Sequence, residues 1–389
     1  SLWYDISKRM KGNFQIIFLI IFIFAALLGV LVFSGAIPIG EETPGSLGKV
    51  ILWGTAPSLA MSGIIKNFND TNPTFIVVYE QKSADTFDQE LLEAAASGKG
   101  PDIFFLPDNL IFSYIDKIFT IPYQSYPLTS FKNNFSGAGE VFLTSKGILA
   151  FPMSIDPLMM YYNRSIFDAN GIIYPPAYWD EMNSIVPALT KKEDSNKITK
   201  SAIAFGHFSN VNNAKDILTT LFMQAGNPIV KEKEGVFNST LNLSIGNFNL
   251  SSILKFYTDF ADPNNPLYSW NKSFPNSLDA FTKENLAFYF GYASELQSLV
   301  KRNPNQNFFV APMPQIRNST FKLTGSRVTG LAISSFSKNT AAAFLAASLM
   351  SGSDFSSKFA KAISIPPARR DLLVVKPEDA LSPIFYSSA

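Results

Sequence analysis

Several carboxylates and amides lie within or just after apolar runs of this chain, where they could hydrogen-bond a ligand. Asp108 comes just after the apolar run 103–106, and Asp156 lies beside Pro157 within a second apolar run. A carboxylate in apolar surroundings needs partners to offset its burial, and ligand hydroxyls or backbone N–H groups would both serve. Asn210 and Asn212 lie in a polar segment, and amides both donate and accept. These residue types suit a neutral ligand that carries hydroxyl groups, and the same groups could instead pair with the backbone amides of a peptide.

The composition argues against several other kinds of chemistry. The chain has no cysteine, which excludes disulfides, zinc thiolate sites, cysteine nucleophiles and lipid attachment at a cysteine. Its one histidine, His207, does not by itself make a metal site or a nucleophilic triad. Lys and Arg number 32 against 31 for Asp and Glu, without the basic stripe typical of nucleic-acid binding. We therefore expect no catalytic residue, no metal, no cofactor and no nucleic-acid partner.

Near the N-terminus, residues 14–33 form an apolar run in which Gln15 is the only strongly polar side chain. About 20 residues of helix span the hydrocarbon core of a membrane. The basic residues Lys8, Arg9 and Lys11 precede the run, and such residues stay cytoplasmic. The sequence therefore predicts a single-pass protein of the cell membrane whose large domain is extracytoplasmic. The predicted segments are a cytoplasmic N-terminus at 1–13, a transmembrane anchor at 14–34 and a linker at 35–48.

A cleaved signal peptide is the alternative for the same run. The small residues Ser34, Gly35 and Ala36 would suit cleavage. The apolar core of a signal peptide is about 7–15 residues, however, and this run is longer. The length favours an uncleaved anchor.

The chain beyond the linker is too long for one compact core and suits two. Short runs rich in β-branched and aromatic residues alternate there with segments of helical periodicity. This alternation predicts a parallel sheet with right-handed crossovers, and so an α/β lobe. The predicted strands are 49–53, 75–79 and 101–106, with helices around 61–68 and over 87–96.

Several short motifs occur in a fixed order. The longest stretch reads I-L-A-F-P-M-S-I-D-P at 148–157 and Y-N-R-S-I-F-D-A-N-G at 162–171, with P-P-A-Y-W-D-E-M after it at 175–182. Shorter matches are P-D-I at 101–103, V-A-P-M-P at 310–314, T-G-L-A-I at 329–333 and I-P-P-A-R-R at 365–370. Together they resemble the family-1 extracellular solute-binding proteins of ABC importers, relatives of the maltose-binding protein. The resemblance covers about residues 50–372.

The resemblance implies a two-lobed α/β fold of the periplasmic-binding-protein type, with hinge strands and ligand held between the lobes. Ligand that contacts both lobes only in the closed form drives closure. The implied function is capture of a small molecule, here a carbohydrate, and delivery to the permease subunits of an ABC transporter. On this pattern we expect lobe one at 48–154 plus 311–335 and lobe two at 155–308 plus 338–389.

The same resemblance implies which residues face the ligand. Relatives carry Asp or Glu at the position of Asp156, an aspartate near Asp108, and a stacking aromatic in the loop that contains Tyr292. An aromatic ring can lie against the apolar face of a sugar. Arg327 is the one cation that could meet a charged ligand, which argues against an anionic one. The predicted ligand-binding residues are Thr55, Asp108, Asp156, Asn210, Asn212, Trp270 and Tyr292.

Two other classes of function remain as alternatives. Asp108 and Asp156 could be the carboxylate pair of an extracytoplasmic glycan-processing enzyme, although the chain carries no signature of such an enzyme. A ligand-sensing receptor would use the same lobes to report a ligand to a partner protein. The ordered motifs favour transport over both.

Overall fold

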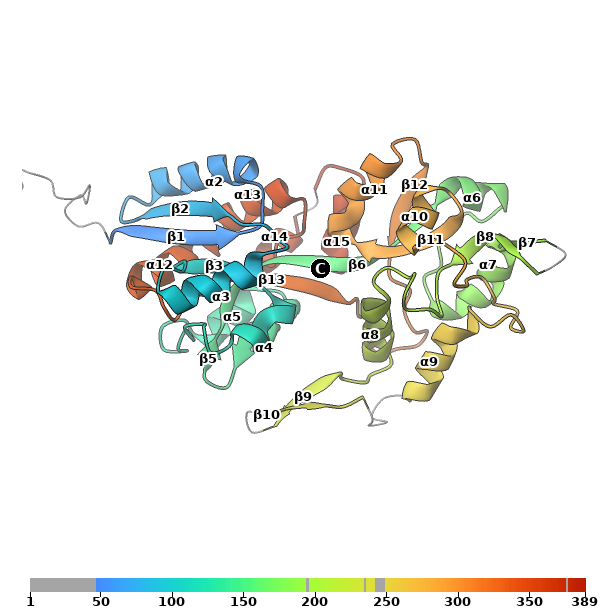
Figure 1. Cartoon of the computed structure of the whole chain (residues 1–389), viewed down its shortest axis with the longest axis horizontal. Coiled ribbons are helices and arrows are strands. Elements are labelled where there is room, and N and C mark those ends of the chain that lie inside the picture. Colours follow the sequence, from blue (N-terminus) through green and yellow to red (C-terminus); the bar gives the residue numbers. More distant parts are fainter. Residues whose placement is uncertain (1–46, 194–195, 234–235, 242–248, 376) are drawn as a thin grey trace, which may run out of the picture.

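The computed structural model describes residues 47–193, 196–233, 236–241, 249–375 and 377–389. The predicted cytoplasmic segment and anchor lie outside these described residues, as does most of the linker. None of the described helices is long and apolar enough to cross a membrane. Figure 1 shows two bodies of helices and strands, joined near the centre by long strands.

The first lobe is built on three parallel strands. Strand β1 (Lys49–Gly54) lies between β2 (Ile76–Gln81) and β3 (Ile103–Pro107). Helix α2 (Ser58–Thr71) connects β1 to β2, and α3 (Phe87–Ser97) connects β2 to β3. The predicted alternation of strands and helices, and the parallel pairing, are confirmed.

The ends of both helices follow from the local sequence. Helix α2 ends before Asn72, because Pro73 disfavours helical backbone in the residue that precedes it. The side-chain amide of Asn72 then donates to the carbonyl of Phe68 at 2.8 Å, one of the groups left unpaired at the helix end. Helix α3 ends at Gly98, whose φ of 65° is left-handed and favours glycine.

In the described part of the chain, nine strands form one mixed sheet that runs through both lobes. Strand β13 (Ser326–Ile333) pairs antiparallel with β3, and β6 (Ala150–Asn163) pairs antiparallel with β13. Farther along its length, β6 pairs with β11 (Leu286–Tyr292) on one edge and with β12 (Phe308–Pro312) on the other. Strands β8 (Ile198–Ile203) and β7 (Lys191–Lys192) complete the sheet beyond β11.

Strand β6 therefore belongs to both lobes. Its residues 150–157 pair with β13, and its residues 158–163 pair with β11 and β12. The side chains of Phe151 and Met153 are buried in the first lobe, whereas Leu158 is buried in the second. The strand crosses between the lobes where its partners change, between Pro157 and Leu158.

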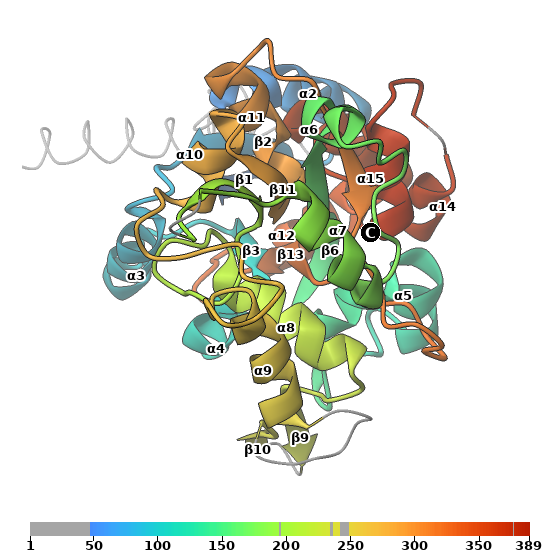
Figure 2. The same ribbon diagram turned by 90° about the vertical axis from the view of Figure 1, so that its right-hand side faces the viewer.

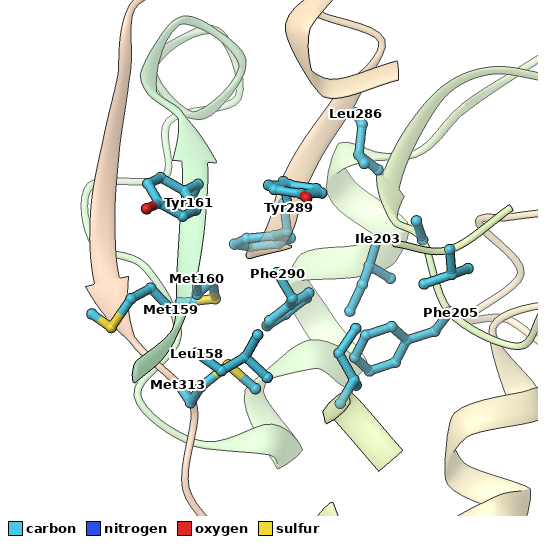
Figure 3. Close-up of a cluster of buried hydrophobic side chains, with 14 of the residues drawn as sticks. Leu158, Met159, Met160, Tyr161, Ile203, Phe205, Leu286, Tyr289, Phe290 and Met313 are labelled. Carbon is cyan, nitrogen blue, oxygen red and sulfur yellow. The ribbon is translucent and has the colours of Figure 1, made fainter. Parts of the chain in front are cut away.

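The core of the second lobe forms around the end of β6. Residues 158–161 of β6 pack against β11, β8 and the surrounding helices, and aromatic rings such as Phe205, Tyr289 and Phe290 fill much of the space (Figure 3). Helices α7 to α10 cover this core: α7 (Met182–Leu189), α8 (Ala214–Gln224), α9 (Leu250–Asp259) and α10 (Ser277–Thr282).

The remaining elements are a projecting hairpin, several short helices and turns, and the C-terminal helices. The hairpin of β9 (Val230–Lys233) and β10 (Val236–Ser239) projects beyond α8 and α9 in both views (Figure 1, Figure 2). The others are η1 (Asp108–Leu110), α4 (Ile111–Tyr114), α5 (Leu128–Asn134), η2 (Gly137–Phe142), β4 (Leu143–Thr144), β5 (Gly147–Ile148), α6 (Arg164–Ala169), η3 (Trp179–Glu181), η4 (Ala293–Glu295), α11 (Leu296–Arg302), α12 (Thr340–Met350), α13 (Ser353–Ile363), α14 (Arg370–Leu373) and α15 (Ser382–Ser388).

The C-terminal helices differ from the predicted division into lobes. Residues 338–389 were expected in lobe two, but α12 and α13 pack into the core of the first lobe through residues such as Ala346 and Phe359. Of the C-terminal helices that the structure describes, only α15 returns to the second lobe, where Phe385 is buried. The periodicity of a helix shows that one face is buried, but it does not show which lobe buries it.

The segment 313–325 also lies with the lobe opposite to the one expected. Met313 is buried in the second core, and the amide of Gln224 on α8 donates to the carbonyls of Pro314 and Leu323. We therefore propose a revised division from these contacts. The first lobe comprises 49–157 and 326–373, and the second comprises 158–325 and 381–389.

Candidate functional site

Three of the predicted site residues lie in one cluster between the lobes. Asp156 lies on the shared strand β6, Asp108 begins the turn after β3, and Tyr292 ends β11. Two further residues join them, Arg327 of β13 and Asp216 in the first turn of α8. We refer to these five residues as the interlobe cluster.

Asp156 is a nearly buried carboxylate, with 8% of its surface exposed. Its Oδ1 accepts a hydrogen bond from the backbone N–H of Ser294 at 2.9 Å. Burial raises the pKa of Asp156, and the bonds from Ser294 and the charge of Arg327 oppose that rise. A backbone N–H group thus supplies one of the partners that the sequence led us to expect.

Asp108 faces the same cluster from the first lobe. Its Oδ2 accepts a hydrogen bond from the backbone N–H of Val328 at 3.2 Å, which ties the turn after β3 to strand β13. Burial raises the pKa of this carboxyl, against the backbone bond from Val328 and the charge of Arg327. Both predicted carboxylates are therefore costly to keep charged without a cation or hydrogen-bond donors nearby.

Arg327 is the cation of the cluster. It lies directly opposite Asp156 in the antiparallel pairing of β13 with β6, so both side chains project from the same face of the sheet. Its Nη2 donates to Oδ2 of Asp216 at 3.2 Å, and its guanidinium lies 3.7 Å from the ring centroid of Tyr292. The guanidinium therefore joins β13, α8 and β11 in one place.

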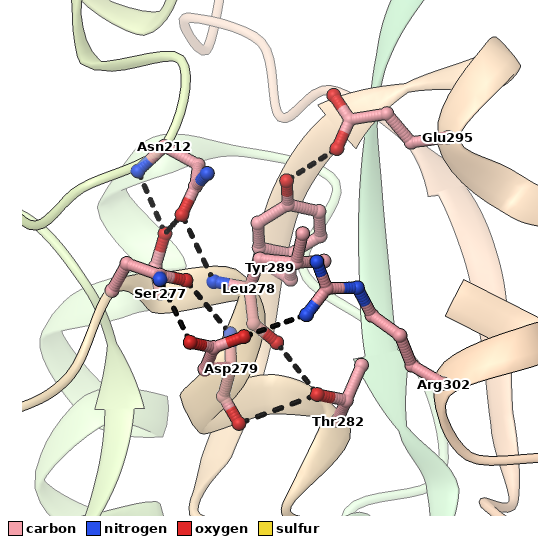
Figure 4. A network of polar contacts seen from close by, with 9 residues as sticks. Asn212, Ser277, Leu278, Asp279, Thr282, Tyr289, Glu295 and Arg302 are labelled. Atoms are coloured by element: carbon pink, nitrogen blue, oxygen red, sulfur yellow. Dashed lines mark hydrogen bonds and ion pairs between the residues drawn. The ribbon is translucent and has the colours of Figure 1, made fainter. Parts of the chain in front are cut away.

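Tyr292 is held firmly by the turn that follows it. Its backbone N–H donates to Glu295 Oε1 at 3.0 Å, and its carbonyl accepts from the hydroxyl of Tyr161 at 2.9 Å. Glu295 also accepts from the amide of Asn213 at 2.9 Å. It accepts a further bond from the hydroxyl of Tyr289 (Figure 4). These bonds fix η4, and with it the N–H of Ser294 that faces Asp156.

The other predicted residues use their polar groups within the protein. Asn212 accepts from the hydroxyl of Ser277 and the N–H of Leu278 (Figure 4). Asn210 donates to two carbonyls and accepts from Nε1 of Trp270 at 3.1 Å. Their amides therefore hold loops of the second lobe together. The sequence had instead suggested that these amides were free to bind a ligand.

Trp270 and Thr55 are also placed apart from the interlobe cluster. Trp270 is fully buried, at 0% exposure, and stacks on Phe274 at 4.5 Å between ring centroids. Its ring is a core residue in this structure and offers no face to a ligand. Thr55 is exposed in the loop after β1.

A separate cavity of about 880 Å³ opens between the lobes. Its walls include Ala138 of the first lobe, Met313 of the second, and Ser326 and Val328 of β13. Side chains alternate between the two faces of a strand, so Ser326 and Val328 point away from the face that carries Arg327. Asp108 borders this cavity and is the only predicted site residue that does so among those described.

Asp216 is the member of the cluster that sequence reasoning missed. An acidic residue in the first turn of a helix is common, because it interacts favourably with the helix dipole. That position therefore carries no sign of a site. Among the described residues, no group of three or more His, Cys, Asp and Glu side chains is arranged to hold a metal ion.

Comparison with known proteins identifies the family. The model of the bacterial extracellular solute-binding proteins matches residues 54–354, most of the chain. The chain belongs to this family, and it is therefore a binding protein. The family membership that the ordered motifs suggested is confirmed, and the enzyme alternative is set aside.

Curated relatives match over a shorter stretch. Proteins of Brucella abortus and Brucella suis, named provisionally as binding proteins, are 26% identical over 123 residues. The match covers 31% of this chain and 29% of those relatives.

Solved structures share the fold over nearly the whole described chain. A cyclo/maltodextrin-binding protein complexed with maltotetraose has a TM-score of 0.70 at 18% identity, over 90% of this chain and 86% of that one. The sugar-binding protein MalE of Xanthomonas citri has a TM-score of 0.68 at 18% identity, over 87% of this chain and 85% of that one. The substrate-binding protein Lmo0181 of Listeria monocytogenes, in complex with cycloalternan, has a TM-score of 0.64 at 19% identity. That match covers 88% of this chain and 85% of the other. At these identities the likeness shows the two-lobed fold.

Proposed function

We propose that this protein binds a small carbohydrate between its two lobes, at the interlobe cluster. The observation that carries the proposal is the meeting of Asp156, Arg327 and Tyr292 where strand β6 passes from one lobe to the other. Ligand at this point contacts groups from both lobes, which is the condition for closure on binding.

The chemistry of the cluster suits a polyhydroxylated molecule. Carboxylates accept hydrogen bonds from hydroxyl groups, a guanidinium donates to hydroxyl or ring oxygens, and planar side chains pack on apolar C–H faces. An anionic ligand would be repelled by the carboxylates of Asp108, Asp156 and Asp216, with a single arginine in the cluster to attract it. Bound maltotetraose and cycloalternan in structures of the same fold support the carbohydrate class.

We further propose that the protein delivers this ligand to the permease subunits of an ABC importer, tethered to the membrane by residues 14–34. Membership of the extracellular solute-binding family supports the importer. The apolar run and its basic flank support the tether. A lobe pair that closes on ligand would give the permease a shape to recognise.

Titration calorimetry with a panel of neutral saccharides tests the proposal, beginning with maltotetraose, mannobiose and cycloalternan. We expect at least one to bind. Asp156→Asn should weaken that binding by about 1.5–3 kcal/mol, the range for hydrogen bonds to charged groups. Asp116→Asn is the matched control, because Asp116 is paired with Lys117 at the surface. Equal affinity in wild type and Asp156→Asn would contradict the site, and no binding by any saccharide would contradict the ligand class.

A further inference from the structure

The ring of Tyr292, predicted from the sequence as a sugar-stacking surface, is covered in this structure. Only 2% of the residue is exposed. The guanidinium of Arg327 lies over the ring, 3.7 Å from its centroid. A sugar therefore has no free face of Tyr292 to stack on while Arg327 keeps this position.

The covering side chain is itself accessible. The side chain of Arg327 is 53% exposed, and that of its partner Asp216 is 29% exposed. Within the described residues the guanidinium donates one hydrogen bond, from Nη2 to Asp216, out of the five N–H groups that arginine has. One partly exposed ion pair and one ring contact thus hold the guanidinium of Arg327 over Tyr292, and both interactions are weak enough for a ligand to replace.

Arg327 also has other acceptors close by. Asp156 lies opposite it in the strand pairing, and the charge of Arg327 acts on both Asp156 and Asp108. A guanidinium that leaves Tyr292 can therefore remain within the cluster, paired with a buried carboxylate. Its remaining N–H groups would then be available to ligand oxygens.

The contact that must break joins different parts of the fold. Arg327 lies on β13, which pairs with β6 at this residue and with β3 from Thr329 onward, whereas Asp216 lies on α8 of the second lobe. The side chain of Ile217, next to Asp216, is buried in the second core. Separation of Arg327 from Asp216 therefore breaks an ion pair between α8 and the strand that borders the first lobe.

We propose that the guanidinium of Arg327 covers the ring of Tyr292 in the absence of ligand and is displaced from it when a sugar binds there. Ligand binding then requires the ion pair between Arg327 and Asp216 to break. This inference rests on the proposed function, because it concerns the same site. It implies that a neutral ligand, which carries no charge itself, will nevertheless bind with an affinity that depends on salt.

The test measures that salt dependence. The affinity of the best neutral saccharide in the panel is measured by calorimetry from about 10 mM to about 1 M NaCl, which shortens the Debye length from about 30 Å to about 3 Å. Salt weakens a partly exposed ion pair, so less has to be given up on binding. We expect the affinity of the wild-type protein to rise about two- to fivefold over this range.

Two variants remove the ion pair from opposite sides. Arg327→Ala and Asp216→Asn should both lose the salt dependence, and Asp216→Asn should bind about two- to fivefold more tightly than wild type at low salt. Arg317→Ala is the matched control, because Arg317 stacks on Tyr178 at 4.1 Å and pairs with Asp180 at 2.7 Å outside the interlobe cluster. It should keep the salt dependence of the wild type, along with any general effect of salt.

The outcomes separate the inference from the proposed function. Binding that does not change with salt in the wild type, or that changes equally in Arg327→Ala, would overturn the inference and leave carbohydrate binding intact. If no neutral saccharide binds the wild-type protein, the proposed function fails and the inference fails with it. Urea unfolding of each variant checks that a change in affinity does not come from loss of the fold.

Discussion

The carboxylate of Asp156 and the backbone N–H of Ser294 are joined at 2.9 Å across 138 residues of sequence. Asp156 lies on β6, the strand that both lobes share, and Ser294 lies in η4 of the second lobe. The bond offsets only part of the cost of burial, since the pKa of Asp156 is still raised. A carboxylate left in this condition favours a hydrogen-bond donor from a ligand.

The raised pKa of Asp156 predicts how stability changes with pH. A carboxyl whose pKa is higher in the folded than in the unfolded protein stabilises the fold below its ordinary value of 3.8, and this contribution is lost as pH rises through the raised value. The free energy of unfolding of wild type should therefore fall relative to Asp156→Asn as pH rises above about 3.8, by about 1.4 kcal/mol for each unit by which the pKa is raised. Urea unfolding at a series of pH values measures this.

Asp116 provides the control of opposite sign. Lys117 lowers its pKa, so its contribution is present above 3.8 and is lost as pH falls through the lowered value. The difference between wild type and Asp116→Asn should change in the reverse direction. A pH-independent difference for Asp156→Asn would show that burial does not perturb this carboxyl.

The parallel sheet of the first lobe could be predicted from the sequence because its signals are local. Short apolar runs, helical periodicity and breakers such as Gly98 each act within a few residues, and the connections between them were short. The lobe to which α12 belongs depends instead on contacts with distant strands. Its run of alanines makes this helix apolar on several faces. The sequence therefore indicates that the helix is buried, but not which face packs against which lobe.

The candidate site was predictable only in part, for a related reason. Asp156 could be identified because a charge inside an apolar run of sequence needs hydrogen-bond partners, and the structure supplies one in Ser294. Trp270 and the asparagines gave the same sequence pattern as binding residues, but loop–loop hydrogen bonds and stacking use them internally. Asp216 gave no pattern, because its role arises from where α8 meets Arg327.

Trp270 should therefore act on stability and leave ligand affinity unchanged. Trp270→Phe keeps most of the stacking on Phe274 but removes the hydrogen bond to Asn210, leaving a polar group of the second lobe unpaired. We expect a loss of about 1–3 kcal/mol in the free energy of unfolding. Affinity for the best saccharide should stay within twofold, measured by calorimetry. A large loss of affinity in a stable variant would mean that Trp270 contacts the ligand after all.

Ligand should bring the two lobes closer together. The ligand would contact groups of both lobes around β6 and β13, so the closed form gains contacts that an open form lacks. Small-angle scattering should show a smaller radius of gyration with the bound saccharide than with a saccharide of equal size that does not bind. The bound form should also gain about 2.7 kcal/mol of stability at a ligand concentration 100 times Kd. Tight binding without any change in the radius of gyration would contradict closure.

The apolar run at 14–33 should keep the protein in the membrane. Some 20 apolar residues insert as a helix, and the preceding Lys8, Arg9 and Lys11 should hold the N-terminal side in the cytoplasm. After a carbonate wash, full-length protein should remain in the membrane fraction, and protease outside intact cells should digest the large domain. A variant without residues 1–46 should be released by the same wash. Recovery of a free form that begins near Gly35 or Ile37 would instead establish a cleaved signal peptide.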